Sequence, residues 1–431
     1  MMLALAYTLV NEGLYDKNFI STHTVGLEKF IPYLNGDKDG QPKNAEWAAQ
    51  ITGVSAQTII NLARRMAECR TMISTAWSLQ RSDHGEQPIW LTVILASLLG
   101  QIGLPGGGFG IGYGCENGIG NPVKIFNWPA LSQGTNSVEE FIPVARIADM
   151  LLHPGTKFDY DGQELSYPDI RLLYWAGGNP FHHHQDLNRL VDAFRQPECV
   201  IVNEIWWTAT ARHADIVFPI TTVLERNDLM MTKWEPMATP MHKAIEPVGE
   251  SRNDYDVFSG LAQRLGFFEE FTEGRNEEEW LRHLWDQARQ RAGQANFELP
   301  DFDTFWHEGP KEILKAEDKT VLLEAYRKDP QNNPLATPSG KIEIFSDVIA
   351  GFGYGDCPGH PVWMEPFEWL GGKTVKKFPL HIISNQPSTR LHSQLDSGSI
   401  SKGSKIKDRE PMTMNPVDAA GRGIKTGDVV R

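Results

Sequence analysis

The sequence has few cysteines, and the four that it has lie far apart. They are Cys69, Cys115, Cys199 and Cys357, and no two of them form a C-x-x-C pair. This spacing argues against a structural zinc site or a cysteine-ligated iron–sulfur cluster within this stretch. So low a count does not suggest a disulfide scaffold. We interpret all four cysteines as packed, inert thiols.

Long apolar runs and an excess of positive charge are also missing. The apolar stretch after Met1 is short, follows no basic residues and continues into a polar helical pattern, unlike a signal peptide or membrane span. The run from Trp90 to Leu99 is too short to cross a bilayer and is typical of a buried helix. A formal net charge of −14 argues against nucleic-acid binding through a basic surface. A local basic patch can still hold a phosphorylated cofactor.

The common phosphate-binding motifs are absent from the glycine-rich tract at 103–120. Eight of the fifteen residues from Gly106 to Gly120 are glycine, but no G-K-[ST] or G-x-G-x-x-G occurs. This excludes a P-loop and argues against a conventional nicotinamide dehydrogenase. We interpret the tract as a lid over a cleft, with a flexible loop as the alternative.

The patterns that are present predict an α/β protein. A chain of 431 residues with 41% apolar and 22% charged residues has room for two or three globular domains. Apolar periodicity predicts helices within 44–69, with Ser55 as an N-cap, from about Ser137 and at 185–194. Short apolar runs predict strands at 70–76, 170–175, 199–203 and 214–219. Strands that alternate with helices indicate parallel sheets covered by helices.

The character of the chain changes after Pro379. A strand is predicted at 380–384, and the later segments are short, turn-rich and punctuated by glycine, as in a small β-barrel. The expected fold is Rossmann-like parallel sheets flanked by helices, followed by a partial C-terminal β-barrel. We divide the chain into an α/β part at 1–130, a Rossmann-like part at 131–360 and a truncated barrel at 375–431.

Both ends of the chain are expected to be cut. The first helix has no N-cap residue before it, and Val429-Val430-Arg431 begins a strand that has no room to finish. Natural but frayed ends are the alternative.

Polar segments follow three predicted strands, where Rossmann-type sheets bind their ligands. They are Trp77 to Arg81, Gly177 to Pro180, and Asn203-Glu204. The glycines allow close backbone approach to a ligand, and the Glu204 carboxylate can accept hydrogen bonds from ribose hydroxyls or a guanine edge. Together these segments predict a binding site at the carboxyl edge of a sheet.

Two further groups of polar residues are candidates. The run His182-His183-His184 is not expected to bind a metal, because adjacent imidazoles cannot all point one way; we expect one of them to face the cleft. In the segment 390–394, Arg390 can fork onto a phosphate and His392 can donate to one. Asn415 is either a ligand contact or a turn cap.

Taken in order, several motifs resemble the dimethyl sulfoxide reductase family of molybdopterin oxidoreductases. The motifs are AWSLQRSDHGEQ, GLPGGGFGIGYG, YWAGGNPFHHHQDLNR, WWTATARHADIVFP, ERND, TPSGKIEIFS, QPSTRLHSQL and REPMTMNPVDAAGRGIKTGDVV. Within the family the chain is most similar to the branch of dimethyl sulfoxide, trimethylamine-N-oxide and biotin sulfoxide reductases. The resemblance does not identify the substrate.

The resemblance implies contacts to bis(molybdopterin guanine dinucleotide). The implied contacts to one pterin dinucleotide are Trp77, Ser78, Gln80 and Arg81. Asn179 and His183 would approach a guanosine diphosphate portion, and Glu204 a ribose or guanine edge. The residues that would close over the pterins are Arg390, His392, Ser393 and Asn415. The activity implied is two-electron reduction of an S-oxide or N-oxide, with electrons from a cytochrome or a quinol-linked protein.

The chain departs from the family in one respect. Members of this branch hold molybdenum through a serine in an N-terminal half that no segment here matches, so the metal ligand is expected outside this chain and the isolated chain is expected to be inactive. The alternatives are a cofactor-less or orphan piece of the fold, or a relative of formate dehydrogenases and nitrate reductases. The family implies a periplasmic location, with the cytoplasm as the alternative.

Overall fold

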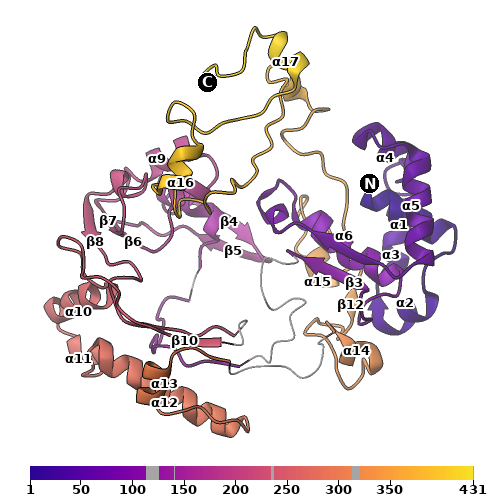
Figure 1. The fold of residues 1–431 in the computed structure, drawn as a ribbon. Helices are drawn as coiled ribbons and strands as arrows, with labels where there is room; N and C mark the ends of the chain where they lie inside the picture. Colours follow the sequence, from indigo (N-terminus) through magenta and orange to yellow (C-terminus); the bar gives the residue numbers. More distant parts are fainter. Residues whose placement is uncertain (113–125, 140, 234–236, 313–320, 431) are drawn as a thin grey trace.

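The computed structural model describes residues 1–112, 126–139, 141–233, 237–312 and 321–430. Figure 1 shows three parts: a helical N-terminal part, a second α/β part beside it, and a C-terminal segment that lies over the second part before it leads away. Cys115 and residues 113–120 of the glycine-rich tract lie outside the described residues, so the prediction of a lid there stays a prediction.

The N-terminal part is built from helices and a small parallel sheet. Its elements are α1 (Met2–Asn11), α2 (Lys17–His23), β1 (Thr24–Val25), α3 (Leu27–Asn35), α4 (Ala45–Thr52), α5 (Ala56–Glu68), β2 (Met72–Thr75), the 3-10 turn η1 (Trp77–Arg81), α6 (Glu86–Leu98) and β3 (Gly108–Ile111). Strands β2 and β3 pair in parallel, with Met72 opposite Gly108. The Ser55 hydroxyl accepts from the Thr58 amide at 3.2 Å, as an N-cap should. The two helices within 44–69 and the following strand are thereby confirmed.

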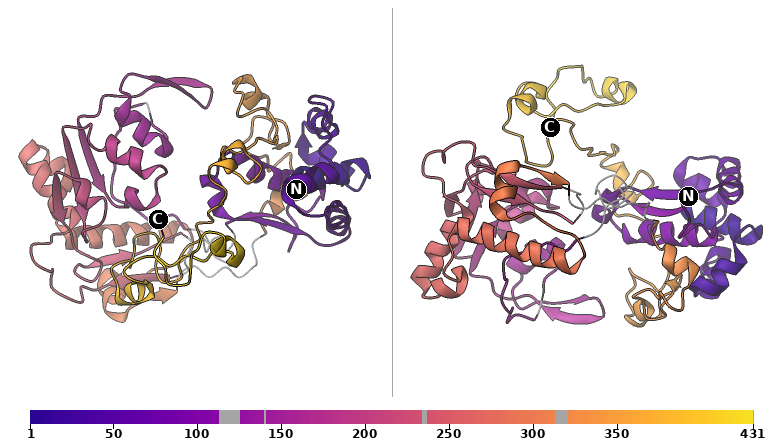
Figure 2. Two further views of the ribbon diagram at one scale, coloured as in Figure 1. Left: turned by 90° about the horizontal axis from the view of Figure 1, so that it is seen from above. Right: turned by 60° about the horizontal axis from the view of Figure 1, so that its bottom comes forward.

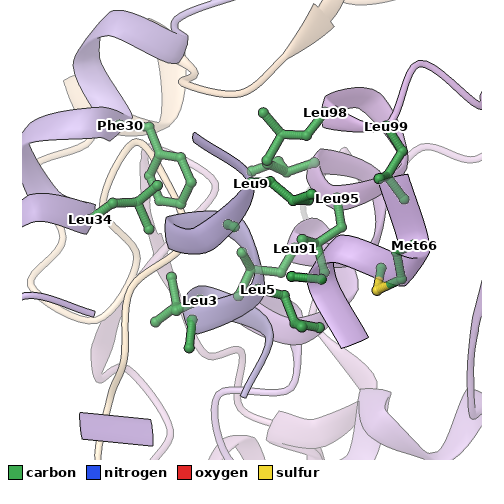
Figure 3. Close-up of a cluster of buried hydrophobic side chains, with 14 of the residues drawn as sticks. Leu3, Leu5, Leu9, Phe30, Leu34, Met66, Leu91, Leu95, Leu98 and Leu99 are labelled. Atoms are coloured by element: carbon green, nitrogen blue, oxygen red, sulfur yellow. The ribbon is translucent and has the colours of Figure 1, made fainter. Parts of the chain in front are cut away.

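Figure 3 shows the core of this part, where side chains of α1, α3, α5 and α6 meet. Helix α6 is apolar on all sides because it is surrounded by other elements, which confirms the buried helix predicted around Trp90 to Leu99. On α5 the buried positions are Ile59, Ala63 and Met66, whereas Leu62 is 37% exposed. The apolar face of α5 is therefore narrower than its sequence indicates.

The chain returns to this core after the second part. The returning elements are α14 (Glu324–Lys328), β12 (Ile342–Glu343) and α15 (Asp347–Gly351). Strand β12 pairs in parallel with β1, and the Arg327 guanidinium donates to the carbonyl oxygens of Gly100 and Ile102 at 2.7 Å each. Figures 1 and 2 show these elements beside the N-terminal helices in every view. The sequence-based division instead grouped these residues with 131–360.

The second part contains the Rossmann-like sheet. Its elements are the 3-10 turn η2 (Val144–Arg146), α7 (Ile147–Leu152), the hairpin β4 (Lys157–Tyr160) and β5 (Gln163–Ser166), β6 (Leu172–Ala176), α8 (Pro180–His183), α9 (Leu187–Ala193), β7 (Cys199–Glu204), the 3-10 turn η3 (Ala211–His213) and β8 (Ile216–Pro219). Strands β6, β7 and β8 are parallel and adjacent in that order. Phe181, Leu190 and Val202 pack between helices and sheet. The predicted parallel α/β unit is confirmed.

A helical extension completes the second part. It comprises β9 (Asp228–Met230), β10 (Met237–Met241), α10 (Asp254–Leu265), α11 (Phe268–Thr272), α12 (Glu277–Gln294), α13 (Phe302–Glu308) and β11 (Lys311–Glu312). Strand β10 lies between β9 and β11 and is antiparallel to both. Trp285 of α12 is fully buried at the centre of this extension, stacked on Phe305 at 3.7 Å between ring centroids.

Two predicted elements are wrong. Residues 137–139 form no helix; the Asn136 side chain instead accepts from the Val138 amide in a turn, and the helix of this region is α7. Residues 380–384 form no strand, because no neighbouring strand pairs with them among the described residues. The C-terminal segment there holds α16 (Ser399–Ser404), α17 (Pro416–Ala420) and two isolated β-bridges, preceded by the 3-10 turn η4 (Lys373–Lys376).

None of the helices in the described ranges is both long enough and apolar enough to pass through a bilayer.

Candidate functional site

The first candidate segment, η1, follows directly from β2. The indole of Trp77 packs over Gly112, where a Cβ atom would lie 2.3 Å from a ring carbon, so only glycine fits there. Ser78, Gln80 and Arg81 are exposed. The Arg81 guanidinium donates through Nη1 to the carbonyl oxygen of His183 at 2.8 Å. This bond joins two predicted segments that are 102 residues apart in the chain.

The second segment forms an open turn at the end of β6. Gly177 and Gly178 have φ values of 80° and 75°, and apart from its chain neighbours no described residue has an atom within 4 Å of the position that a Cβ of Gly177 would take. Asn179 follows and is only 3% exposed. Its side-chain oxygen accepts a hydrogen bond from the Thr210 hydroxyl, whereas its amide nitrogen Nδ2 is buried and has no partner among the described residues.

The environment of the three histidines after this turn favours the neutral imidazole ring. The Asn179 backbone N–H donates to His183 Nε2 at 3.3 Å, so the ring is neutral with its proton on Nδ1. Burial lowers the pKa of His183, and the neighbouring His184 and Arg81 lower it further. Burial is also the main cause of the lowered pKa values of His182 and His184.

These histidines predict that acid destabilises the fold. Because their folded-state pKa values lie below the ordinary value of 6.5, the unfolded chain binds more protons, and stability falls as the pH drops below about 6.5. We expect a lower urea midpoint at about pH 5.5 than at about pH 7.5. Substituting His182, His183 and His184 together by Gln should reduce that difference. The exposed His381 offers a control, since His381→Gln should leave the difference unchanged; an undiminished difference in the triple variant would contradict the prediction.

The third segment contains a buried residue, Asn203, and a half-buried residue, Glu204. Asn203 is 3% exposed and is fully engaged, since it accepts from the Tyr174 hydroxyl at 2.9 Å and donates to Asp254 at 2.8 Å. Glu204 is half-buried; its carboxylate accepts from the Ile205 amide and from the Thr208 hydroxyl, each at 2.9 Å. Each carboxylate oxygen retains acceptor capacity for a ligand.

The C-terminal segment contacts the histidines of α8. The rings of His183 and His392 meet edge to face, with centroids 5.8 Å apart. The Arg390 side chain is 15% exposed; its Nη1 donates to the His392 carbonyl oxygen, its Nη2 pairs with Glu410 at 3.1 Å, and its Nε faces Asp396 at 3.4 Å. Lys405 pairs with Asp396 at 2.8 Å and holds the pKa of that carboxyl below its usual value.

The predicted residues are thus brought together in part. Arg81, Asn179, His183, Arg390 and His392 form one connected group through these contacts, with Ser393 half-buried beside it in the chain. Asn415 lies apart: it is exposed and caps α17 by accepting from the Val417 amide at 2.9 Å, and Figure 1 shows α17 away from α9 and α16.

Sequence reasoning missed the residues that support this group. Thr208 and Thr210 hold Glu204 and Asn179, while Asp396, Lys405 and Glu410 surround Arg390. Thr208-Ala209-Thr210 begins four residues after β7 ends, and the sequence of this segment does not show which side chain each hydroxyl contacts. In the described part of the chain, no three His, Cys, Asp or Glu side chains come close enough together to hold a metal ion.

Two family models match the chain. Residues 1–264 match the molybdopterin oxidoreductase model, and residues 380–431 match that of the molybdopterin dinucleotide binding domain. Among solved structures, acetylene hydratase from Pelobacter acetylenicus has a TM-score of 0.62 and 18% identity, covering 99% of this chain and 58% of that one. This structural similarity shows that the two chains share a fold.

Curated relatives align with the whole chain. They include biotin sulfoxide reductase of Cereibacter sphaeroides (48% identity, 58% of its length covered), trimethylamine-N-oxide reductase of Haemophilus influenzae (50%, 54%) and dimethyl sulfoxide/trimethylamine N-oxide reductase of Rhodobacter capsulatus (48%, 54%); each alignment covers 100% of this chain. The chain spans a little over half the length of these relatives. By its motifs, its family models and these identities, the chain belongs to the molybdopterin oxidoreductase family, in its dimethyl sulfoxide reductase branch.

Proposed function

We propose that this chain forms part of a molybdenum enzyme that reduces S-oxides or N-oxides, and that it holds part of bis(molybdopterin guanine dinucleotide). The observation that carries the proposal is the buried Asn179 amide nitrogen, which no described residue bonds, beside the open Gly177-Gly178 turn at the carboxyl end of a parallel strand. Buried donors are almost always paired in native proteins, so this one indicates a ligand that supplies the acceptor.

The chemistry of the surrounding groups suits a pterin dinucleotide. Such a cofactor carries pyrophosphate oxygens, ribose hydroxyls and a guanine edge. Arg81 uses one guanidinium nitrogen for His183 and has further donors for phosphate oxygens. Glu204 has acceptor capacity for hydroxyl or amino groups, and the exposed Ser78 and Gln80 can contribute donors and acceptors along η1.

The residues of this chain would bind and orient the cofactor. Trp77, Ser78, Gln80 and Arg81 would lie along one pterin dinucleotide, Asn179 and His183 along its diphosphate, and Glu204 at the nucleoside. In the C-terminal segment, the residues that would close over the pterins are Arg390, His392, Ser393 and Asn415. Because the His183 ring is neutral, it would contact the cofactor without adding a positive charge. When bound, the molybdenum cofactor supplies two-electron oxygen-atom transfer.

The same proposal includes the domain boundaries, the electron donor and the cellular compartment. We assign 1–130 to one α/β domain, 131–360 to the Rossmann-like dinucleotide-binding region and 375–431 to part of a β-barrel; within 131–360, residues 324–351 pack against the first of these domains. The match of residues 380–431 to a molybdopterin dinucleotide binding domain supports the last assignment. A cytochrome or a quinol-linked protein would donate electrons, and the periplasm is the proposed compartment.

The test is to produce the chain in a bacterial host that makes this cofactor, alone and together with the part of the Haemophilus influenzae relative that it does not cover. The complemented protein should contain molybdenum, release GMP on acid hydrolysis, and reduce dimethyl sulfoxide, trimethylamine-N-oxide or biotin sulfoxide with a reduced viologen. The isolated chain should show little turnover. A folded, complemented protein with neither molybdenum nor GMP would refute the proposal.

A further inference from the structure

One loop fixes the side chains at two neighbouring strand ends. Thr210, which is fully buried, donates from its hydroxyl to the Asn179 side-chain oxygen at the end of β6. Two residues earlier, the Thr208 hydroxyl donates to Glu204 at the end of β7, at 2.9 Å. Because both threonines belong to Thr208-Ala209-Thr210, a single short segment holds both of these side chains.

This loop is itself held firmly against α8. The His213 ring stacks on Phe181 with centroids 4.2 Å apart and an angle of 10° between the planes. The same imidazole is hydrogen-bonded through Nδ1 to the Ala209 carbonyl oxygen at 2.7 Å. The loop that carries Thr210 is therefore held in place by contacts that do not involve the Asn179 side chain.

The hydrogen bond from Thr210 sets the orientation of the Asn179 side-chain amide. A carboxamide has an acceptor end and a donor end, and rotation by a half-turn exchanges them. The Thr210 hydroxyl occupies one end, and the other end is buried without a partner among the described residues. With its oxygen bonded to Thr210, the amide presents its NH₂ group, which suits a phosphate or carbonyl oxygen.

We propose that Thr210 is a positioning residue: it orients the Asn179 amide so that Nδ2 donates to an oxygen of the nucleoside diphosphate portion of the ligand. The proposal rests on the dinucleotide-binding function proposed above. Thr210 acts only through Asn179, so its contribution to binding disappears when the Asn179 side chain is removed.

The experiment measures GDP binding by the 431-residue chain with isothermal titration calorimetry. Thr210→Val keeps the shape of the side chain and removes the hydroxyl; we expect about five- to tenfold weaker binding, the effect of one lost hydrogen bond. Thr210→Ser keeps the hydroxyl and should bind GDP within about twofold of the parent. Circular dichroism at the assay temperature establishes that each variant is folded.

A double-mutant cycle separates positioning from a merely structural role. Asn179→Ala should weaken GDP binding at least as much as Thr210→Val, and adding Thr210→Val to Asn179→Ala should cause no further loss. A Thr210→Val variant with parental affinity would overturn the inference, as would additive losses in the double variant. A parent chain that does not bind GDP would overturn it too, whereas the reductase proposal is judged separately by the molybdenum content and turnover of the complemented protein.

Discussion

Replacing Arg390 by alanine is expected to release residues 390–410 from their place beside α8. This guanidinium connects Asp396, Glu410 and the His392 carbonyl oxygen, and it is only 15% exposed. The described part of the C-terminal segment has isolated bridges and no strand pairing, so side-chain interactions hold its shape. Without Arg390, Lys405 is the remaining cation that pairs with both Asp396 and Glu410 among the described residues. We therefore expect amide hydrogen exchange across 390–410 to become at least about tenfold faster.

Two variants control this prediction. Arg390→Lys keeps the charge but loses the forked geometry, so its exchange rates should be intermediate. Arg422→Ala removes an arginine of the same segment that pairs only locally with Asp418 at 3.6 Å, and it should leave exchange at 390–410 unchanged. Equal rates in Arg390→Ala and the parent chain would show that backbone packing, and not the ion network, holds the segment. In the complemented protein, the GMP content of Arg390→Ala should fall as well.

Replacing Trp285 by alanine is expected to give a large loss of stability. The indole is fully buried, stacks on Phe305 and donates from Nε1 to the Pro300 carbonyl oxygen at 2.9 Å. Deleting it removes a large apolar surface and leaves a cavity between α12 and α13, at a cost of about 3–5 kcal/mol. Urea unfolding followed by far-ultraviolet circular dichroism measures this loss.

Trp285→Phe is the matched control. It keeps an aromatic ring over Phe305 but loses the hydrogen bond to Pro300, so it should cost clearly less than alanine. Hydrogen exchange should locate the alanine effect in α12 and α13 and not in β6 to β8, since a different set of side chains packs against that sheet. An unchanged urea midpoint in Trp285→Ala would mean that this cluster contributes little to the stability of the chain.

Local patterns predicted the second α/β unit well. The apolar runs at 170–175, 199–203 and 214–219 correspond to β6, β7 and β8, because short, continuous apolar runs bounded by turn residues are typical of parallel strands; of these three strands, β7 is the one with buried residues. The run at 380–384 has the same pattern but no partner strand among the described residues. Strand pairing is a tertiary property, so an apolar run alone cannot predict it.

The candidate site was predictable where it depends on strand ends. Turns after parallel strands lie at one edge of the sheet: Asn179 follows β6, and Glu204 ends the adjacent strand β7. The contact of Arg81 with His183 spans 102 residues, and the ring contact of His183 with His392 spans more than 200. Thr210 was missed because its importance lies in the atom that it touches, and a buried threonine hydroxyl has no sequence pattern of its own.

The pairing of β1 with β12 has a consequence for how the protein is made. Thr24 lies opposite Ile342, so the N-terminal part leaves the ribosome long before the strand that completes it. The segment 126–312 can meanwhile fold on its own sheet and helices. Phe126 and Ala238 belong to one core cluster, and Ala238 pairs with Lys311, so the two ends of this segment lie near each other, which reduces the entropic cost of joining β1 to β12. The second α/β unit would thus act during synthesis as a folded linker that returns the chain to β1.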